Sequence, residues 1–78
     1  MIPDELITQC RQYYKKHPSG GSLHIALDDG NMETDHVQFC LDYAMKERDR
    51  AGVKLARTLL ELSLEQREEL YERLWEVS

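Results

Sequence analysis

Apolar residues recur every three or four positions over most of this chain, which is the spacing that places them on one face of an α-helix. The pattern predicts a first helix from Pro3 to about Lys16, because proline suits a first helical turn and Pro18 then stops the helix. A second helix is expected from Glu33 to Arg48, with Asn31 or Thr34 as its cap. The apolar residues of each helix form a stripe that is wide enough to bury one face of the helix, but not two.

Two further helices are predicted in the C-terminal part, and each begins with its own capping signal. Asp49 can cap a helix whose apolar stripe starts at Val53. Ser63 and Gln66 have the spacing of a capping box, which indicates that a new helix starts there. The apolar side chains of this last helix are Leu70, Tyr71, Leu74, Trp75 and Val77. Four short-linked helices predict a compact, mostly α single domain over residues 1–78, a bundle of about four short helices.

Residues 20–31, which we call the connector, interrupt the helical pattern between the first two predicted helices. The connector begins with Gly20 and Gly21, continues through an apolar run at residues 23–27 and ends in turn-forming residues at 28–31. An apolar run closed by a turn predicts a short strand. A lone strand cannot satisfy its own backbone groups, so the segment is either an extended, partly buried loop or pairs with its copy in a homodimer.

The connector and the start of the second predicted helix hold most of the side chains suited to recognition or chemistry. The candidate binding residues are His24, Asp28, Asp29, Asn31, Asp35 and His36. An enzyme would use His24 as a base and Asp28 or Asp29 to orient it, although alternation along a strand would turn His24 outward. Turn capping is the stronger interpretation of the two aspartates, and Gly30 is expected to take a positive φ angle.

Two other kinds of site have weaker signals. His24, His36 and Cys40 carry ligand atoms that zinc accepts, but the paired spacing of a zinc motif is missing. Cys40 also belongs to an apolar stripe, which favours a place in the core. The glycines at the start of the connector lack the lysine and the length of a phosphate-binding loop. Metal binding is therefore left open, and no cofactor is predicted.

Tyr71 and Trp75 lie one helical turn apart in the last predicted helix. Large aromatic side chains dominate both cores and interfaces, so two roles are open to this pair. The favoured interpretation is that they close the core. The other is that they form a secondary contact patch for a partner.

Composition narrows the class of protein. The chain has 78 residues, of which 41% are hydrophobic and 32% charged, so it is globular rather than disordered. Its net charge of −5 makes direct nucleic-acid binding unfavourable, because such binding needs a basic surface. The sequence contains neither an export signal nor an apolar run long enough for a bilayer. We therefore expect a cytosolic protein, with Cys10 and Cys40 as buried free thiols.

Four stretches of the chain carry a family resemblance. They are Leu23–Asn31, His36–Cys40, and Leu59-Leu60 followed by Gln66–Tyr71. These stretches resemble a group of short, largely uncharacterised proteins encoded by bacteriophages and prophages, over about Gly20 to Leu74. The resemblance transfers no catalytic residues, and it implies the cytoplasm of a bacterial host cell. The resemblance further implies a protein that binds a host protein, including defence systems such as CRISPR effectors, or one that captures a signalling nucleotide.

We therefore expect a small binding protein that inhibits or modulates a host protein, rather than an enzyme. The connector with Asp35 and His36 is the predicted contact surface. One alternative is a nucleotide-binding or metal-binding protein that uses residues 20–36. Another is a structural accessory subunit of a phage assembly.

Overall fold

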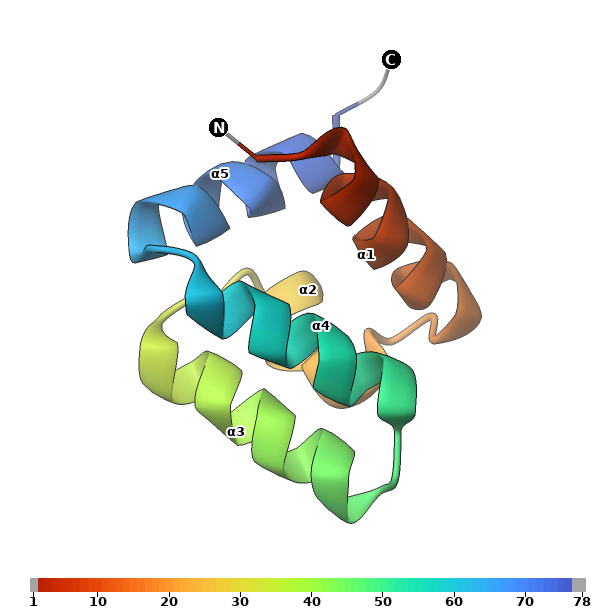
Figure 1. The fold of residues 1–78 in the computed structure, drawn as a ribbon. Coiled ribbons are helices and arrows are strands. Elements are labelled where there is room, and N and C mark those ends of the chain that lie inside the picture. The colour runs from red at the N-terminus through yellow and green to blue at the C-terminus, as the bar shows by residue number, and fades with distance from the viewer. Residues whose placement is uncertain (1, 77–78) are drawn as a thin grey trace.

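The structure is a computed structural model that describes residues 2–76, and these residues form helices around a shared hydrophobic core (Figure 1). The elements are α1 (Asp4–Lys16), η1 (Gly21–Leu23), α2 (His24–Leu27), α3 (Thr34–Lys46), α4 (Arg50–Glu61) and α5 (Leu64–Leu74), of which η1 is a 3-10 turn. All four predicted helices are present close to their expected positions, as α1, α3, α4 and α5. The predicted mostly α fold is thereby confirmed; Val77 lies outside the described residues.

The helices are arranged in two groups with α2 between them (Figure 1). α3 and α4 run antiparallel and pack along each other, while α1 packs against α5 on the other side of the molecule. η1 and α2 pack against α3. None of the described helices is long and apolar enough to cross a lipid bilayer.

The predicted strand over residues 23–27 is wrong, because this segment is helical. It comprises the end of η1 and the whole of α2. Leu23, Ala26 and Leu27 are fully buried. Ala26 and Leu27 follow Leu23 by three and four residues, which is the spacing that places side chains on one face of a helix. Short helical turns satisfy locally the backbone groups that a lone strand would leave unpaired. The described residues therefore contain no strand that could pair with a second copy.

The capping signals of the last two helices act as the sequence predicts. The Asp49 carboxylate accepts a hydrogen bond from the Gly52 amide at 3.1 Å and caps α4. The Ser63 hydroxyl accepts from the Gln66 amide at 3.1 Å, and the Gln66 side chain accepts from the Ser63 amide at 3.0 Å. These amides would otherwise be unpaired at a helix start, so the contacts fix where α4 and α5 begin.

The start of α3 differs from the prediction. Neither Asn31 nor Thr34 is its N-cap, because Glu33 occupies that position without a side-chain capping bond. The Thr34 hydroxyl instead accepts a hydrogen bond at 2.8 Å from Arg67, a buried arginine of α5. Arg67 also donates to the Met32 carbonyl at 2.6 Å. One arginine therefore holds the start of α3 against α5.

The core contains both cysteines, as the sequence predicts. Cys10 and Cys40 are fully buried free thiols. Burial raises the pKa of Cys10 to about 11, and it also raises the pKa of Cys40. Both thiols therefore stay protonated near neutral pH and pack as small hydrophobic groups.

Candidate functional site

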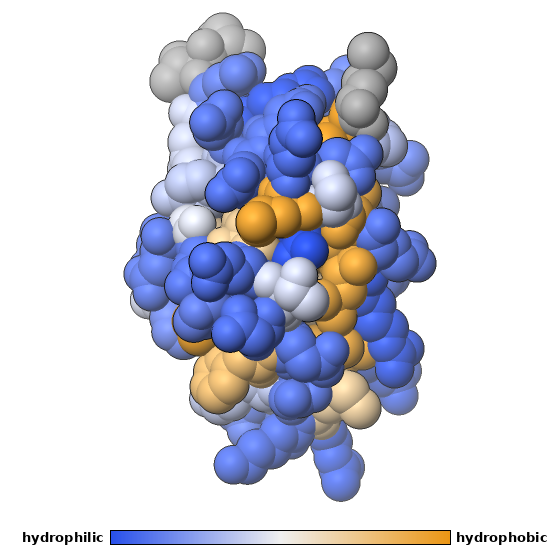
Figure 2. Space-filling view, turned by 90° about the vertical axis from the view of Figure 1, so that its left-hand side faces the viewer, coloured by the Kyte–Doolittle hydropathy of each residue, from blue (hydrophilic) through white to orange (hydrophobic). Residues whose placement is uncertain are grey.

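Several large hydrophobic side chains remain exposed on the described part of the molecule. They are Phe39, Tyr43, Met45, Leu64 and Trp75. Figure 2 shows one side of the molecule, where a strip of hydrophobic side chains interrupts a mainly hydrophilic surface. Isolated exposed residues of this kind are common and need no special explanation. Trp75 differs from the others because it packs with two tyrosines.

Trp75, Tyr14 and Tyr71 form what we call the aromatic cluster. The ring centroids of Tyr14 and Trp75 lie 4.8 Å apart at an angle of 87°, and those of Tyr71 and Trp75 lie 6.3 Å apart at 76°. These are edge-to-face arrangements, which aromatic pairs prefer. Tyr71 packs against the core, whereas Trp75 is 44% exposed. The role of Tyr71 and Trp75 as a contact patch stays a prediction.

Tyr14 connects the aromatic cluster to the connector. Its hydroxyl donates a hydrogen bond to Asp28 Oδ1 at 2.9 Å, and this bond is the main cause that raises the pKa of Tyr14. Gly30 has the predicted positive φ, at +77°, and a Cβ atom there would lie 2.7 Å from Cζ of Tyr71. The fold thus brings the acidic end of the connector against aromatic side chains from α1 and α5.

The other predicted residues of the connector lie around this contact. His24 and Asp29 are exposed, and Asn31 is half-buried. The Asn31 side chain accepts a long hydrogen bond, 3.4 Å, from the Glu33 amide. Within residues 2–76, no side-chain hydrogen bond joins His24 to either neighbouring aspartate, so the orienting contact of the enzyme hypothesis is not formed.

His36 lies beside carboxylates and not with the other predicted metal ligands. Its Nε2 atom is 3.8 Å from Glu33 Oε2 and 4.0 Å from Asp35 Oδ1. One ligand atom from each of these three residues lies within 4.8 Å of the others. Both carboxylates are exposed, and surface clusters of this kind form without metal. The described residues hold no cluster that unites His24, His36 and Cys40.

Four hollows on the described surface are lined by residues outside the aromatic cluster and outside residues 23–31 of the connector. Gly21 and Ser22, at the start of the connector, line one of these hollows together with His17, Tyr43 and Glu47. Sites for small ligands such as nucleotides are concave and bury most of the ligand. The aromatic cluster and residues 23–31 therefore suit contact with a macromolecule better than enclosure of a small ligand.

Sequence reasoning missed Tyr14 as a member of the site. Tyr13 and Tyr14 are consecutive residues of α1, and neighbouring helical residues point about 100° apart. Tyr13 is buried and Tyr14 is half-buried at the edge of the stripe. A tyrosine at such an edge has a hydroxyl that needs a polar partner, and this was the available signal.

Similarity to known proteins adds no function to this geometry. Comparison of the chain with models of protein families, with curated proteins and with solved structures found no match. The resemblance to phage-encoded proteins therefore stays an expectation from the sequence.

Proposed function

We propose that this chain is a small binding protein that attaches to a host protein through the aromatic cluster and the connector, and thereby inhibits or modulates that protein. The observation that carries the proposal is the position of Tyr14. Its hydroxyl bonds to Asp28 while its ring packs on Trp75. Acidic and aromatic groups are therefore held together in one surface before any partner arrives.

The chemistry of this surface favours a partner segment that contains arginine or lysine beside apolar residues. The faces of tryptophan and tyrosine attract cations, arginine most often. Asp29 offers an exposed carboxylate next to them. Exposed ion pairs contribute only about 0–1 kcal/mol each, so most of the affinity would come from burying Trp75 and its neighbours.

Host-defence proteins that bind nucleic acid fit this description. CRISPR effectors hold their RNA–DNA duplex in a positively charged channel, so cationic segments are part of their working surface. An acidic and aromatic surface that covers such a segment would compete with the nucleic acid. The proposal therefore includes an anti-CRISPR role as one form of host-protein inhibition.

The single tryptophan makes the proposal testable, because Trp75 lies within the proposed contact surface. Affinity purification from the bacterial host followed by mass spectrometry would supply candidate partners. Each purified candidate would then be titrated against the chain while tryptophan emission is recorded, using a partner region that lacks tryptophan. Binding at the proposed surface should shift the emission to shorter wavelength and saturate.

Charge variants provide the matched control. Asp28→Ala with Asp29→Ala should weaken partner binding by at least about tenfold while the far-UV circular dichroism spectrum stays unchanged. Asp42→Asn with Glu47→Gln removes the same two negative charges at exposed positions elsewhere and should bind normally. Equal binding by both double variants, together with full binding by Trp75→Ala, would contradict the proposal.

A further inference from the structure

The basic residues of this acidic chain are concentrated in one segment. Half of the ten lysines and arginines lie within residues 46–57, where only Glu47 and Asp49 are acidic. Five basic and two acidic residues give this segment a charge of +3, which leaves −8 for the rest of a chain with a net charge of −5. The molecule therefore has a strongly uneven charge distribution that its net charge conceals.

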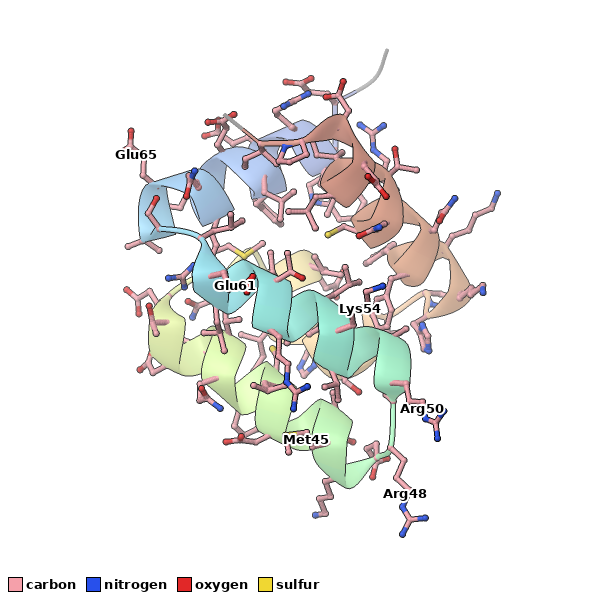
Figure 3. The ribbon with its side chains drawn as sticks, in the orientation of Figure 1. Met45, Arg48, Arg50, Lys54, Glu61 and Glu65 are labelled. Atoms are coloured by element: carbon pink, nitrogen blue, oxygen red, sulfur yellow. The ribbon has the colours of Figure 1, made fainter. Side chains whose placement is uncertain are left out.

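Four of these cations surround a groove of about 640 Å³, which we call the basic groove. Arg48, Arg50, Lys54 and Arg57 line it together with Met45 and Val53. Figure 3 shows that Met45 and Arg48 come from the end of α3 and the turn after it, and that Arg50 and Lys54 come from α4. Met45 is 52% exposed, so apolar surface is accessible among the positive charges.

The fold does not use these cations for its own contacts. Among residues 2–76, the ion pairs involve His36 and Arg73, and none involves a residue of the basic groove. Arg11 and Arg67, by contrast, donate to backbone carbonyls. A helix face that is merely solvated gains from alternating charge signs, whereas Arg50, Lys54 and Arg57 repeat one sign over two turns. Like charges at this spacing destabilise a helix, so these cations do not serve the stability of α4 and are available for an external partner.

We propose that the basic groove binds an acidic segment of a partner protein that also carries an apolar side chain. The arginine side chains fit carboxylates through paired hydrogen bonds, and a flexible methionine adapts to an apolar residue. Arg50 to Arg57 extends about 10 Å along α4, which matches about two turns of an acidic helix. This site is separate from the aromatic cluster and the connector, so it stands or fails independently of the proposed function.

Nucleic acid fits the basic groove less well. A phosphate backbone makes no use of the apolar surface at Met45 and Val53, and no aromatic side chain lines the groove for stacking on bases. Glu61 also lines the groove, at the opposite end of α4 from Arg50, so an anionic partner fits only along Arg50 to Arg57, and a phosphate chain that continued along the helix would meet a like charge (Figure 3). The charge of −8 on the rest of the molecule disfavours a long polyanion, but a short acidic segment ends within the groove.

Three probes of similar length test this proposal by fluorescence anisotropy with the full chain. The first is a labelled helical peptide of about 14 residues with glutamate and leucine on one face, the second has glutamine in place of glutamate, and the third is an oligothymidylate with the same charge as the first. We expect saturable binding of the glutamate peptide, which weakens with salt, and no binding of the glutamine peptide. A fourth probe, a peptide with serine in place of leucine, should bind more weakly than the glutamate peptide.

Variants of the chain locate the contact. Arg50→Gln, Lys54→Gln and Arg57→Gln together should reduce affinity for the glutamate peptide by at least about tenfold. The matched control is Lys15→Gln, Lys16→Gln and Lys46→Gln, which removes three exposed cations from outside the basic groove and should bind normally. Far-UV circular dichroism checks that both triple variants fold.

Three results would overturn the proposal. One is failure of the glutamate peptide to bind. Another is oligothymidylate binding that is at least as tight and is lost in the Arg50/Lys54/Arg57 variant, which would identify a nucleic-acid site. The third is concentration-dependent association of the chain alone in sedimentation experiments, abolished by the same variant, which would identify a second copy as the occupant.

Discussion

The hydroxyl group of Tyr13 allows the sharpest test of how this fold is held together. Tyr13 is buried on α1, and its hydroxyl donates a hydrogen bond to the Asp49 carboxylate. The same oxygen accepts a hydrogen bond from the buried Ser22 amide at 3.1 Å. One side-chain atom therefore joins α1, η1 and the start of α4, which are far apart in the sequence.

Tyr13→Phe keeps the aromatic ring and removes only this oxygen. The Ser22 amide would then be buried without a partner, which costs about 1–3 kcal/mol. The lost bond to the charged Asp49 is worth about 1.5–3 kcal/mol, and water recovers part of it because Asp49 is half-buried. We expect a total loss of about 2–4 kcal/mol, against about 4–12 kcal/mol for the stability of a chain of this length.

Urea unfolding at neutral pH, followed by far-UV circular dichroism, measures this difference. Tyr43→Phe is the matched control, because Tyr43 is 43% exposed. The control should unfold like the wild type, while Tyr13→Phe should unfold at a lower urea concentration with an unchanged slope. A difference below about 0.5 kcal/mol between the two variants would refute the reasoning, since that is the range of ordinary surface substitutions.

Alkaline pH provides a second measurement on the same pair of proteins. Burial, followed by the bond to Asp49, raises the pKa of Tyr13 to about 12, whereas an unfolded tyrosine titrates near about 10. Because the folded pKa is the higher one, the stabilisation is complete below about pH 10 and is lost as the pH rises through about 12. The stability gap between wild type and Tyr13→Phe should therefore shrink over this interval. The other tyrosines are common to both proteins and cancel.

Three further predictions concern other parts of the fold. Gly30→Ala, at φ +77° and with its new Cβ 2.7 Å from Tyr71, should destabilise the fold by about 1–3 kcal/mol and shift tryptophan emission; an unchanged spectrum and midpoint would contradict this. Burial raises the pKa of Asp49, but the hydrogen bonds it accepts lower that pKa overall, so stability is lost as the pH falls below about 4. Asp49→Asn should flatten this acid loss in urea titrations. Cys10 and Cys40 should react with DTNB only after unfolding, and rapid reaction of the native protein would show that the thiols are accessible.

The four long helices could be predicted because their signals are local. A capping residue and the apolar positions of the next two turns lie within a few residues of one another, as at Asp49 and Ser63. The segment 23–27 had no such signal, and a short apolar run fits a strand and a buried helix equally well by periodicity. Its conformation is decided by its surroundings, since Leu23 and Leu27 are buried where η1 and α2 pack on α3.

The candidate site was predictable only in pieces. Asp28 and the Tyr71–Trp75 pair were each recognised as candidates, but their proximity depends on Tyr14, which lies 14 residues before Asp28. No local pattern joins residues so far apart. The buried Arg67 was also unpredictable, because a charged residue near a helix start normally faces solvent.

The connector is held in place by contacts that become visible only in three dimensions. The Asn31 amide donates to the Ile25 carbonyl at 2.8 Å and closes the turn back onto α2, which the core holds in place. Beyond the turn, Arg67 holds the Met32 carbonyl, and Tyr14 holds the Asp28 side chain. A surface held at both ends and at its acidic group loses little conformational entropy when a partner binds. If a partner covers this surface as proposed, the burial of Trp75 and its neighbours would therefore translate more fully into affinity than it would on a flexible loop of the same composition.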